Sequence, residues 1–549
     1  MKLSKLLAVV VIAVSAAACG DLEVVNLNDP DRERAISTPT DVEALIAGSF
    51  SSWWGSGHYS RIFIPMTTMA DAWSSSWGNF GMREMGSEPR EGWNNDPSAT
   101  YASSLFNVWR DSYKALSGVR DGILAVQGGV ALGVDGADNA RALAFASFVQ
   151  GMALARIATT FDKAFIIDEN TSLDDPNALP ELSPYTEVAA AAIAKFDAAI
   201  SGASSSFTIP AAWVGYNSSW SNGRLAEMAH AYKARLMIEV ARDEAERAAV
   251  NWSGVLAEVA AAGNTDFELL GDDTNWAWSR LHYRAGSHEG WGRSDYQWIG
   301  PSDQSGEFQA WANLTNVQLR TPFVIDTDDR RITAAGDPTA DGKYQKYQAG
   351  NNMRAERGTY HWGNYVDSRW RHIRLNSGNG IHGAFPAKEL DYIKAEALYR
   401  TGNMQGAADL INVHRVANGE LPAVTVDGDQ SARCVPRHPT TGACQDLWEA
   451  IKYEKRIELF HYGAGSDFFD DRGWGDLVTN TTIQFPVPGA ELDLLLMEIY
   501  SFGGAGNPGA APQNRRDAID PESIRWKRAA LEAYDEVVQA EGKHGQVIN

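Results

Sequence analysis

The chain has 549 residues and is short of positive charge. It carries 48 Lys and Arg residues against 70 Asp and Glu residues, which gives a formal net charge of −22 at pH 7. Proteins that bind nucleic acids contact phosphates through a basic face, so this deficit argues against a nucleic-acid partner. Charged residues make up 21% and hydrophobic residues 44% of the chain, which is typical of a globular rather than a disordered protein.

The sequence also lacks the short motifs of common enzyme classes, with no H-E-x-x-H, G-x-S-x-G or Walker A pattern. Segment 504–509 matches G-x-G-x-x-G, but it follows no predicted strand and contains Pro508, so we interpret it as a loop. His282 and His288 have no third ligand at zinc-like spacing. Carboxylates are too abundant for counting to reveal a glycosidase pair, and no short segment shows one. We therefore expect a protein that is not an enzyme, with no catalytic residue and no bound metal.

The sequence has no apolar run long enough to cross a membrane, and the apolar run near its N-terminus is also too short to do so. Lys2 and Lys5 precede a short apolar run at 6–14, and four small residues then lead to Cys19. This pattern predicts a lipoprotein signal peptide over residues 1–18, lipidation of Cys19 and a lipidated tether over 19–40. The lipid chains would hold the protein on a membrane. An ordinary signal peptide that happens to end in cysteine is the alternative.

Cysteine is scarce, with three residues in the whole chain. Cys434 and Cys444 lie in a polar loop that contains proline, and in an exported protein such a pair normally forms a disulfide. Two free thiols are the alternative. A zinc site is disfavoured because the nearest histidine, His438, would leave the metal short of ligands.

Hydrophobic residues recur at helical spacing in several stretches, which predicts helices at 141–161, 185–200, 224–242, 252–262, 390–400, 405–416 and 447–461. The pair 390–416, joined by Thr401-Gly402-Asn403, has the small and large residue pattern of a tetratricopeptide helical hairpin. One hairpin cannot bury its own apolar face, so at least three stacked units are expected, with degenerate pairs at 141–201 and 224–262. The predicted fold is mostly α, with a tetratricopeptide-like scaffold mainly over 105–262 and 386–461.

Long segments between these helices are rich in Gly, Trp, Ser, Asn and Asp, mainly over 62–104, 265–385 and 462–549. Loops of this length are usually functional when they are ordered. We expect them to form a large irregular lobe with a few short strands, which faces a ligand and belongs to a single domain over 41–549. Two acidic stretches, 326–329 and 427–429, have the charge density of a calcium loop but lack the Gly and Glu positions of an EF-hand. Solvated turns are the favoured interpretation, and a structural Ca²⁺ is the alternative.

Motifs in order along the chain resemble the SusD/RagB family of outer-membrane lipoproteins. Residues 454–459, Gly463, 468–472 and Trp474-Gly475 resemble its "ERR-x-EL … EG-x-R-x-FDL-x-R-x-G" block. Two places depart from it: His461-Tyr462, where an acidic residue usually precedes the Gly, and Asp471, where Leu is usual. The helix from Phe385-Pro386 to Gly402 resembles "LAE-x-YL-x-YAEAL-x-x-x-G". Segment 485–488 resembles the late "PIP-x-x-EI" strand, 109–113 resembles the "W-x-x-x-Y" helix, and Asn28-Asp29-Pro30 follows the signal as expected.

The resemblance implies a cell-surface binding lipoprotein of the outer membrane. Such proteins lie on a SusC-like TonB-dependent transporter and capture nutrients, mostly glycans and sometimes peptides, for delivery to the pore. Two alternatives remain: capture of a peptide or protein, which the acidic charge suits if the ligand is basic, and an assembly scaffold that uses the repeats for protein contact. An exposed aromatic platform with polar neighbours would favour glycan, an acidic cleft would favour peptide, and a flat apolar repeat surface would favour the scaffold.

Tryptophan is unusually frequent, and its 19 residues equal Phe and exceed the 18 Tyr. The apolar face of a sugar stacks on indole, and its hydroxyls need polar side chains nearby. Two clusters fit this requirement as ligand-binding candidates: Trp73, Trp77, Asn79, Arg83, Trp93 and Asn94, and Trp276, Trp278, Tyr283, Trp291, Tyr296 and Trp298. Burial in the core is the commoner fate of any single Trp, so we expect some of these rings, but not all, to be exposed. Trp109 and Trp474 are assigned to the core, and Trp53-Trp54 are weaker candidates.

Overall fold

The computed structural model describes residues 36, 38–59, 61–172, 180–215, 218–272, 274, 276–285, 290–350 and 363–504. The predicted signal peptide, Cys19 and most of the predicted tether lie outside the described residues. The long helices are α3 (Pro39–Trp54), α6 (Ala102–Gln127), α7 (Asn139–Thr160), α8 (Tyr185–Gly202), α9 (Asn222–Glu239), α11 (Trp252–Ala261), α15 (Lys388–Arg400), α16 (Met404–His414) and α17 (Leu447–Leu459). The helices predicted from the sequence are thus confirmed, with ends that agree to within a few residues.

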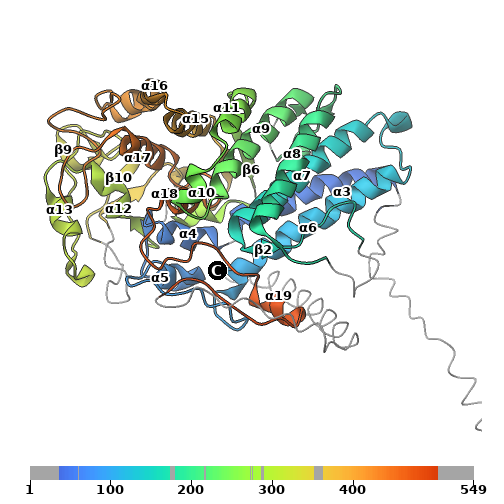
Figure 1. Cartoon of the computed structure of the whole chain (residues 1–549), viewed down its shortest axis with the longest axis horizontal. Coiled ribbons are helices and arrows are strands. Elements are labelled where there is room, and N and C mark those ends of the chain that lie inside the picture. The colour runs from blue at the N-terminus through green and yellow to red at the C-terminus, as the bar shows by residue number, and fades with distance from the viewer. Residues whose placement is uncertain are drawn as a thin grey trace, which may run out of the picture.

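The long helices stack in chain order into one scaffold. Each helix from α6 through α7, α8, α9, α11, α15 and α16 to α17 packs on the next, and α3 packs against α6 and α7. Figure 1 shows this row running from α3 and α6 to α15 and α16 at the other end of the molecule. The contact between α11 and α15 closes the row across the long intervening segment 262–387. The predicted helical-hairpin architecture is confirmed.

Helix α6 lies close to α3 because two of its residues have no side chain. A Cβ on Gly118 would meet the Ser49 hydroxyl at 2.2 Å, and one on Gly122 would meet Ile46 at 2.5 Å. Helix α7 is long and apolar enough to span a membrane by length and composition, but 78% of its most apolar window is buried inside the protein. That burial is the behaviour of a central helix in a stacked scaffold.

Short elements make up the rest of the described chain. The short helices are α4 (Phe63–Met69), α5 (Met82–Met85), α10 (Glu244–Ala248), α12 (Tyr296–Ile299), α13 (Glu307–Ala312), α14 (Arg371–Leu375), α18 (Ser466–Trp474) and α19 (Gly489–Leu494). The strands are β1 (Trp73–Ser74), β2 (Lys163–Ala164), β3 (Ser183–Pro184), β4 (Thr208–Ile209), β5 (Trp220–Ser221), β6 (Phe267–Gly271), β7 (Arg293–Ser294), β8 (Thr333–Ala334), β9 (Asp337–Asp341), β10 (Gln345–Tyr347), β11 (Tyr365–Asp367) and β12 (Gly380–Phe385). They form two-stranded antiparallel pairs, of which β1–β7 and β6–β12 join segments far apart in sequence.

Buried ion pairs fasten the irregular lobe to α17. Arg331, from the lobe, pairs with Glu454 at 2.6 Å and with Glu458 at 3.1 Å, and none of the three side chains is exposed. Arg331 also pairs with Asp329 at 2.7 Å, and Lys388 on α15 pairs with Glu458 at 2.8 Å. The acidic residues of the 454–459 motif therefore hold the scaffold and the lobe together.

The two positions that depart from the family pattern also have structural partners. The His461 ring lies 3.2 Å from the carboxylate of Asp367, and Asp471 pairs with Arg456 at 2.8 Å. Trp109 and Trp474 are buried, as are Trp53 and Trp54 on α3. These residues therefore have structural roles in the fold.

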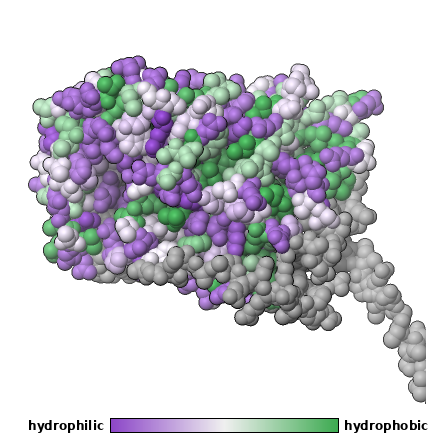
Figure 2. Space-filling model, viewed as in Figure 1, coloured by the Kyte–Doolittle hydropathy of each residue, from purple (hydrophilic) through white to green (hydrophobic). Residues whose placement is uncertain are grey.

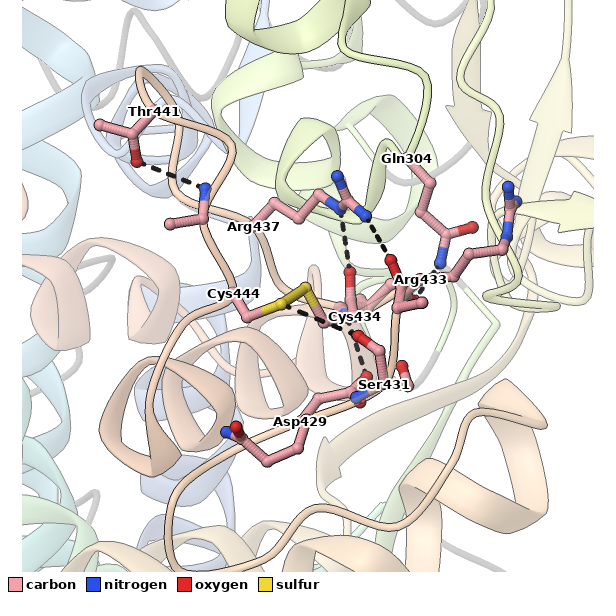
Figure 3. The surroundings of a disulfide bond; sticks show 12 residues. Gln304, Asp429, Ser431, Arg433, Cys434, Arg437, Thr441 and Cys444 are labelled. Atoms are coloured by element: carbon pink, nitrogen blue, oxygen red, sulfur yellow. Dashed lines mark hydrogen bonds between the residues drawn. A yellow bond between two sulfur atoms is a disulfide. The ribbon is translucent and has the colours of Figure 1, made fainter.

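The predicted disulfide is present between Cys434 and Cys444, whose Cα atoms lie 5.6 Å apart. Figure 3 shows the surrounding loop, in which Arg437 donates to the carbonyl oxygens of Cys434 and Ala432. Gln304 of the lobe donates to the carbonyl oxygen of Arg433 at 2.5 Å. The closed loop therefore makes direct contact with the lobe.

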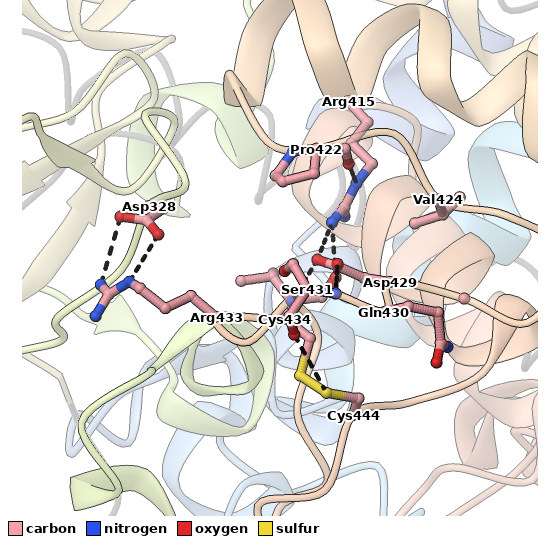
Figure 4. A network of polar contacts seen from close by, with 12 residues as sticks. Asp328, Arg415, Pro422, Val424, Asp429, Gln430, Ser431, Arg433, Cys434 and Cys444 are labelled. Atoms are coloured by element: carbon pink, nitrogen blue, oxygen red, sulfur yellow. Dashed lines mark hydrogen bonds and ion pairs between the residues drawn. A yellow bond between two sulfur atoms is a disulfide. The ribbon is translucent and has the colours of Figure 1, made fainter.

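The two acidic stretches serve as partners for arginine. Asp429 is buried and pairs with Arg415 at 2.8 Å, as Figure 4 shows, and its carboxylate also accepts from the backbone of Ser431 and Val435. Asp329 is buried against Arg331, so a solvated turn is the wrong interpretation for both of these aspartates. Asp326 and Asp328 are exposed and lie against Arg433. Within the described ranges, no group of three or more His, Cys, Asp or Glu residues is placed to hold a metal ion.

Candidate functional site

A two-stranded pair brings the two predicted aromatic clusters together. Strands β1 and β7 run antiparallel, with Trp73 opposite Ser294, although about 220 residues separate them in sequence. The Trp77 indole N–H donates to the carbonyl oxygen of Gly290 at 2.8 Å, and the Ser75 hydroxyl donates to the carbonyl oxygen of Trp291 at 2.5 Å. These contacts place Trp77 beside the segment that carries the second cluster.

The structure corrects part of the list of ligand-binding candidates. Five of the rings are at most 7% exposed: Trp73, Trp93, Trp276, Tyr296 and Trp298. Trp93 packs on Tyr101 and Phe485, and the Trp298 indole donates to the carbonyl oxygen of Arg456. These five rings fill the core of a lobe that has little regular secondary structure, and they offer no face to a ligand.

The remaining rings lie at the surface together with four arginines. We call this set the aromatic–arginine surface, and it consists of Tyr59, Arg61, Trp77, Phe80, Trp278, Arg280, Tyr283, Arg284, Trp291 and Arg374. All ten side chains are partly or fully exposed, and Tyr59 (40%) and Trp77 (36%) are the most open of the aromatic ones. An exposed aromatic platform with polar neighbours is the feature expected of a sugar-binding surface.

The rings of this surface form two groups, and one arginine contacts a ring in each group. In the first, the Trp278 ring centre lies 4.6 Å from that of Tyr283 and 6.2 Å from that of Tyr59. In the second, the ring centres of Phe80 and Trp291 are 5.8 Å apart. The Arg284 guanidinium lies 4.6 Å from the Tyr283 ring centre and 4.5 Å from that of Trp291, so it links the groups.

The other three arginines also lie on aromatic faces. Arg280 is 4.1 Å from the Tyr59 ring centre and 5.1 Å from that of Trp278, and Arg61 is 5.0 Å from that of Phe80. Arg374 on α14 donates to the Tyr283 hydroxyl at 2.8 Å. Cation–π contacts of this kind attract a guanidinium group to the face of an aromatic ring.

A buried stack of histidine and tryptophan rings underlies the platform. Trp54 stacks on His58 and Trp370 stacks on His282, each with 3.6 Å between ring centres. The Nδ1 atoms of His282 and His382 are 3.0 Å apart, and His382 Nε2 lies 3.1 Å from the carbonyl oxygen of Gly378. Because His382 Nε2 must donate to that carbonyl, its Nδ1 accepts and His282 Nδ1 donates.

This histidine stack is uncharged at neutral pH. Burial lowers the pKa of His58 and His282 well below the usual 6.5 and that of His382 to about 4. The neutral rings therefore act as a rigid, close-packed base. Gly378, whose carbonyl oxygen accepts from His382, also packs closely against the Trp278 ring: a Cβ at this position would lie 2.8 Å from the ring.

Two π-helical turns carry two of the three rings of the first group, those of Tyr59 and Tyr283. Tyr59 ends η1 (Gly55–Tyr59), which extends α3, while Tyr283 and Arg284 lie in η5 (Leu281–Ala285). Single π-helical turns occur frequently at functional sites, since the extra residue redirects the side chains that follow. Helix α14 packs against η5, which brings Arg374 to the same place.

Three predicted polar residues lie outside this set. Asn79 is exposed in η2 (Asn79–Gly81), two residues after Trp77, and Arg83 pairs with its neighbour Glu84 at 2.6 Å. The backbone N–H of Arg83 donates to the carbonyl oxygen of Trp77, so both residues border the surface. Asn94 is exposed next to the buried Trp93, and its side-chain oxygen accepts from the backbone of Asp96. Nothing in the structure brings Asn94 to the other candidates.

Sequence reasoning missed six members of the surface: Tyr59, Arg61, Phe80, Arg280, Arg284 and Arg374. A signal was present for two of them, because Arg280 and Arg284 alternate with aromatic residues in the segment 276–284. Phe80 and Arg61 carried no such signal. Their place depends on a backbone with a positive φ of 62° at Phe80 and on the end of η1 just before Arg61.

A cavity elsewhere in the molecule does not have the character of an acidic cleft. It has a volume of about 250 Å³ and is lined by Asp71, Glu449, Asp471 and Asp476, among others. Each of these carboxylates already faces a cation. The pairs are Asp71 with Arg90, Glu449 with Lys452, Asp471 with Arg456, and Asp476 with both Lys452 and Arg456. A basic peptide would have to displace these pairs.

The repeat surface is also not uniformly apolar. The most exposed large hydrophobic residues of the described chain are Val134 and Leu375, at 82% and 74%, and they belong to different elements. Figure 2 shows hydrophobic and hydrophilic residues interspersed over the visible face. A large docking surface for a scaffold role would appear as a contiguous apolar patch.

Solved structures, rather than related sequences, identify the fold of this chain. No protein-family model matches the chain, and no curated protein matches its sequence. Among solved structures, a SusD homolog from Bacteroides thetaiotaomicron matches with a TM-score of 0.55 at 12% identity, over 87% of this chain and 99% of that chain. A SusD superfamily protein from the same species gives 0.51 at 13% identity, over 83% and 96%.

A third structure carries a description of its ligand class. It is a SusD-like carbohydrate binding protein from Bacteroides fragilis, with a TM-score of 0.50 at 14% identity, over 85% of this chain and 89% of that chain. The likeness extends over nearly the whole of each of these structures. The chain therefore has the SusD-like fold, as the motifs in its sequence predicted.

Proposed function

We propose that this protein is a binding lipoprotein that captures a glycan at the aromatic–arginine surface. The observation that carries the proposal is the convergence of Trp77, Trp278, Tyr283 and Trp291, from two segments about 200 residues apart, on one exposed face. Sugars are bound by this combination of flat apolar rings and nearby hydrogen-bond donors. The SusD-like fold and the carbohydrate-binding description of one structural neighbour support it.

The cellular setting follows from the same resemblance. We propose that the mature chain is anchored by a lipid on Cys19 in the outer membrane, is exposed at the cell surface, and delivers its ligand to a SusC-like TonB-dependent transporter. The signal pattern before Cys19 supports the anchor. A single domain over 41–549 is proposed with it, because one large hydrophobic core draws residues from Val42 through to Tyr500, with a smaller second core among α15, α16 and α17.

The proposal predicts that binding depends on Trp278. Removing this ring should weaken oligosaccharide binding about tenfold, because a stacking contact on an aromatic ring contributes up to roughly 1.5 kcal/mol and about 1.4 kcal/mol corresponds to a factor of ten. The measurement is calorimetric titration of residues 21–549 with pooled oligosaccharides, followed also by Trp fluorescence, for the wild type, Trp278→Ala and Trp77→Ala.

Trp448→Ala is the matched control. Trp448 is a partly exposed tryptophan on α17 that likewise lies under an arginine, 4.4 Å from Arg400, but it is not part of the aromatic–arginine surface. Its removal should leave binding unchanged. A glycan response that survives both Trp278→Ala and Trp77→Ala would move the site elsewhere. A response to pooled peptides alone would favour peptide capture instead.

A further inference from the structure

The aromatic–arginine surface concentrates positive charge in an acidic chain. Arg61, Arg280, Arg284 and Arg374 all lie on its rings, whereas the chain as a whole has 22 more acidic than basic residues. Clustered like charges repel, so such a group persists when a partner of opposite charge balances it.

Three of these arginines have no anionic partner among the residues that the structure describes. No described carboxylate lies within ion-pair distance of Arg61, Arg280 or Arg284, and their Nε atoms are enclosed without a hydrogen-bond acceptor. Enclosed arginines elsewhere in the described chain have acceptors of one kind or the other. Arg331 pairs with three carboxylates and Arg247 with two, while Arg242 and Arg472 donate to backbone carbonyl oxygens. The difference sets this surface apart from the structural ion pairs of the fold.

The electrostatics agree with the geometry. Burial lowers the pKa of Arg61, and the charge of Arg280 lowers it further. Burial also lowers the pKa of Arg284. The Tyr283 hydroxyl raises this pKa, while the charges of Arg280, Arg374 and Arg61 lower it further. A guanidinium remains charged at neutral pH despite such shifts. An anion bound here would relieve the mutual repulsion and satisfy the planar N–H donors.

We propose that the glycan captured by this protein is anionic, with carboxylate or sulfate groups that pair with Arg61, Arg280 and Arg284 while its sugar rings stack on Trp278 and Trp77. This inference rests on the proposed function and names the class of ligand for the same surface. A guanidinium fork binds both kinds of oxyanion through two parallel hydrogen bonds. The adjacent rings select a sugar over a bare anion, and the net charge of −22 disfavours a long, densely charged polyanion such as a nucleic acid.

The test compares charged and neutral forms of one glycan on the wild-type protein. A galacturonic acid oligosaccharide and its methyl-esterified form supply the carboxylate arm, and a sulfated galactan oligosaccharide and its desulfated form supply the sulfate arm. We expect at least one charged form to bind about tenfold or more tightly than its neutral counterpart, and added salt to weaken that form selectively. This comparison uses no variant, so it does not depend on the folding of a mutant.

Variants then assign the effect to the arginines. Arg280→Gln and Arg284→Gln should each remove most of the preference for the charged form, while Arg284→Lys retains part of it. Arg400→Gln is the matched control, because the Arg400 guanidinium also lies on a partly exposed tryptophan ring, 4.4 Å from the ring centre of Trp448. It should leave the preference unchanged.

The outcomes separate the two proposals. If neutral and charged forms bind equally well and both depend on Trp278, the anionic inference is wrong and the glycan function stands. If no glycan binds and an oligoglutamate peptide binds through Arg280 and Arg284, both proposals are wrong and the surface captures acidic peptides. If none of these probes binds, both proposals fail.

Discussion

At the residue scale, the chain uses its acidic residues mainly as partners in a charged core. Glu458 on α17 accepts from Arg331, Lys388 and the Tyr344 hydroxyl, and its side chain is fully enclosed. Burial alone would raise its pKa, but Arg331 and Lys388 outweigh burial and lower the pKa to about 2. A buried carboxylate with this many cationic partners stabilises the fold only while it is ionised.

This arrangement predicts a specific loss of stability in acid. The pKa of Glu458 falls from 4.5 in the unfolded chain to about 2 in the folded one, so its contribution is present above pH 4.5 and is lost as the pH falls toward 2. The full shift corresponds to about 3 kcal/mol. Glu458→Gln should therefore destabilise the protein at pH 7, and the difference from the wild type should shrink between pH 4.5 and 2.

Urea unfolding at a series of pH values measures this dependence. Glu420→Gln is the control, since Glu420 is 59% exposed and forms only a surface pair with Lys343. Its effect should be small at every pH. A destabilisation by Glu458→Gln that stays constant down to pH 2 would show that this carboxylate does not contribute through its charge.

Residue composition predicted that some aromatic rings are exposed, but it did not identify which ones. The excess of tryptophan and its two clusters indicated a stacking surface, and the disulfide and the core positions of Trp109 and Trp474 were identified correctly. The burial of Trp73, Trp276 and Trp298 could not be read from the sequence. These rings fill the interior of a lobe without long helices, where no periodicity separates inner from outer positions.

At the element scale, helices with a clear apolar stripe were predictable and short strands were not. The ends of α8, α15 and α16 fall within a few residues of the predicted ones because each has a cap or a glycine stop nearby. Strands of two residues such as β1 and β7 carry no alternation, so their pairing across the chain is a tertiary event. That pairing is the step that creates the site.

The disulfide loop gives a second prediction at this scale. Cys434 is buried, and the two bonded cysteines are 10 residues apart in sequence. The loop that the bond closes lies between the end of α16 and the start of α17. Replacing both cysteines by serine should destabilise the protein by about 2–3 kcal/mol, because the unfolded chain gains the freedom of the open loop. Ligand affinity should not change, since no residue of the aromatic–arginine surface lies in this loop.

Thermal unfolding of the double-serine variant, with and without reductant, checks this prediction. Reductant should lower the midpoint of the wild type toward that of the variant and should leave the variant unchanged. An equal stability of the oxidised wild type and the variant would mean that the loop is held by its hydrogen bonds alone, such as those of Arg437 and Gln304.

At the scale of the whole molecule, the scaffold is continuous in space although the chain interrupts it. The segment between α11 and α15 leaves the helical row, forms most of the irregular lobe and returns to the next position in the row. The chain thereby presents the lobe residues Trp278, Arg280 and Arg284 beside Tyr59 and Trp77 from its N-terminal part. A rigid repeat scaffold that carries long functional loops is a common way to hold a binding site.

The most direct test of the account is the crystal structure of this protein with an oligosaccharide that it binds in solution. The account predicts a sugar ring stacked at about 4 Å on the ring of Trp278 or Trp77, with an acidic group of the sugar against Arg280 or Arg284. A sugar bound elsewhere on the scaffold, with the aromatic–arginine surface left open to solvent, would contradict it.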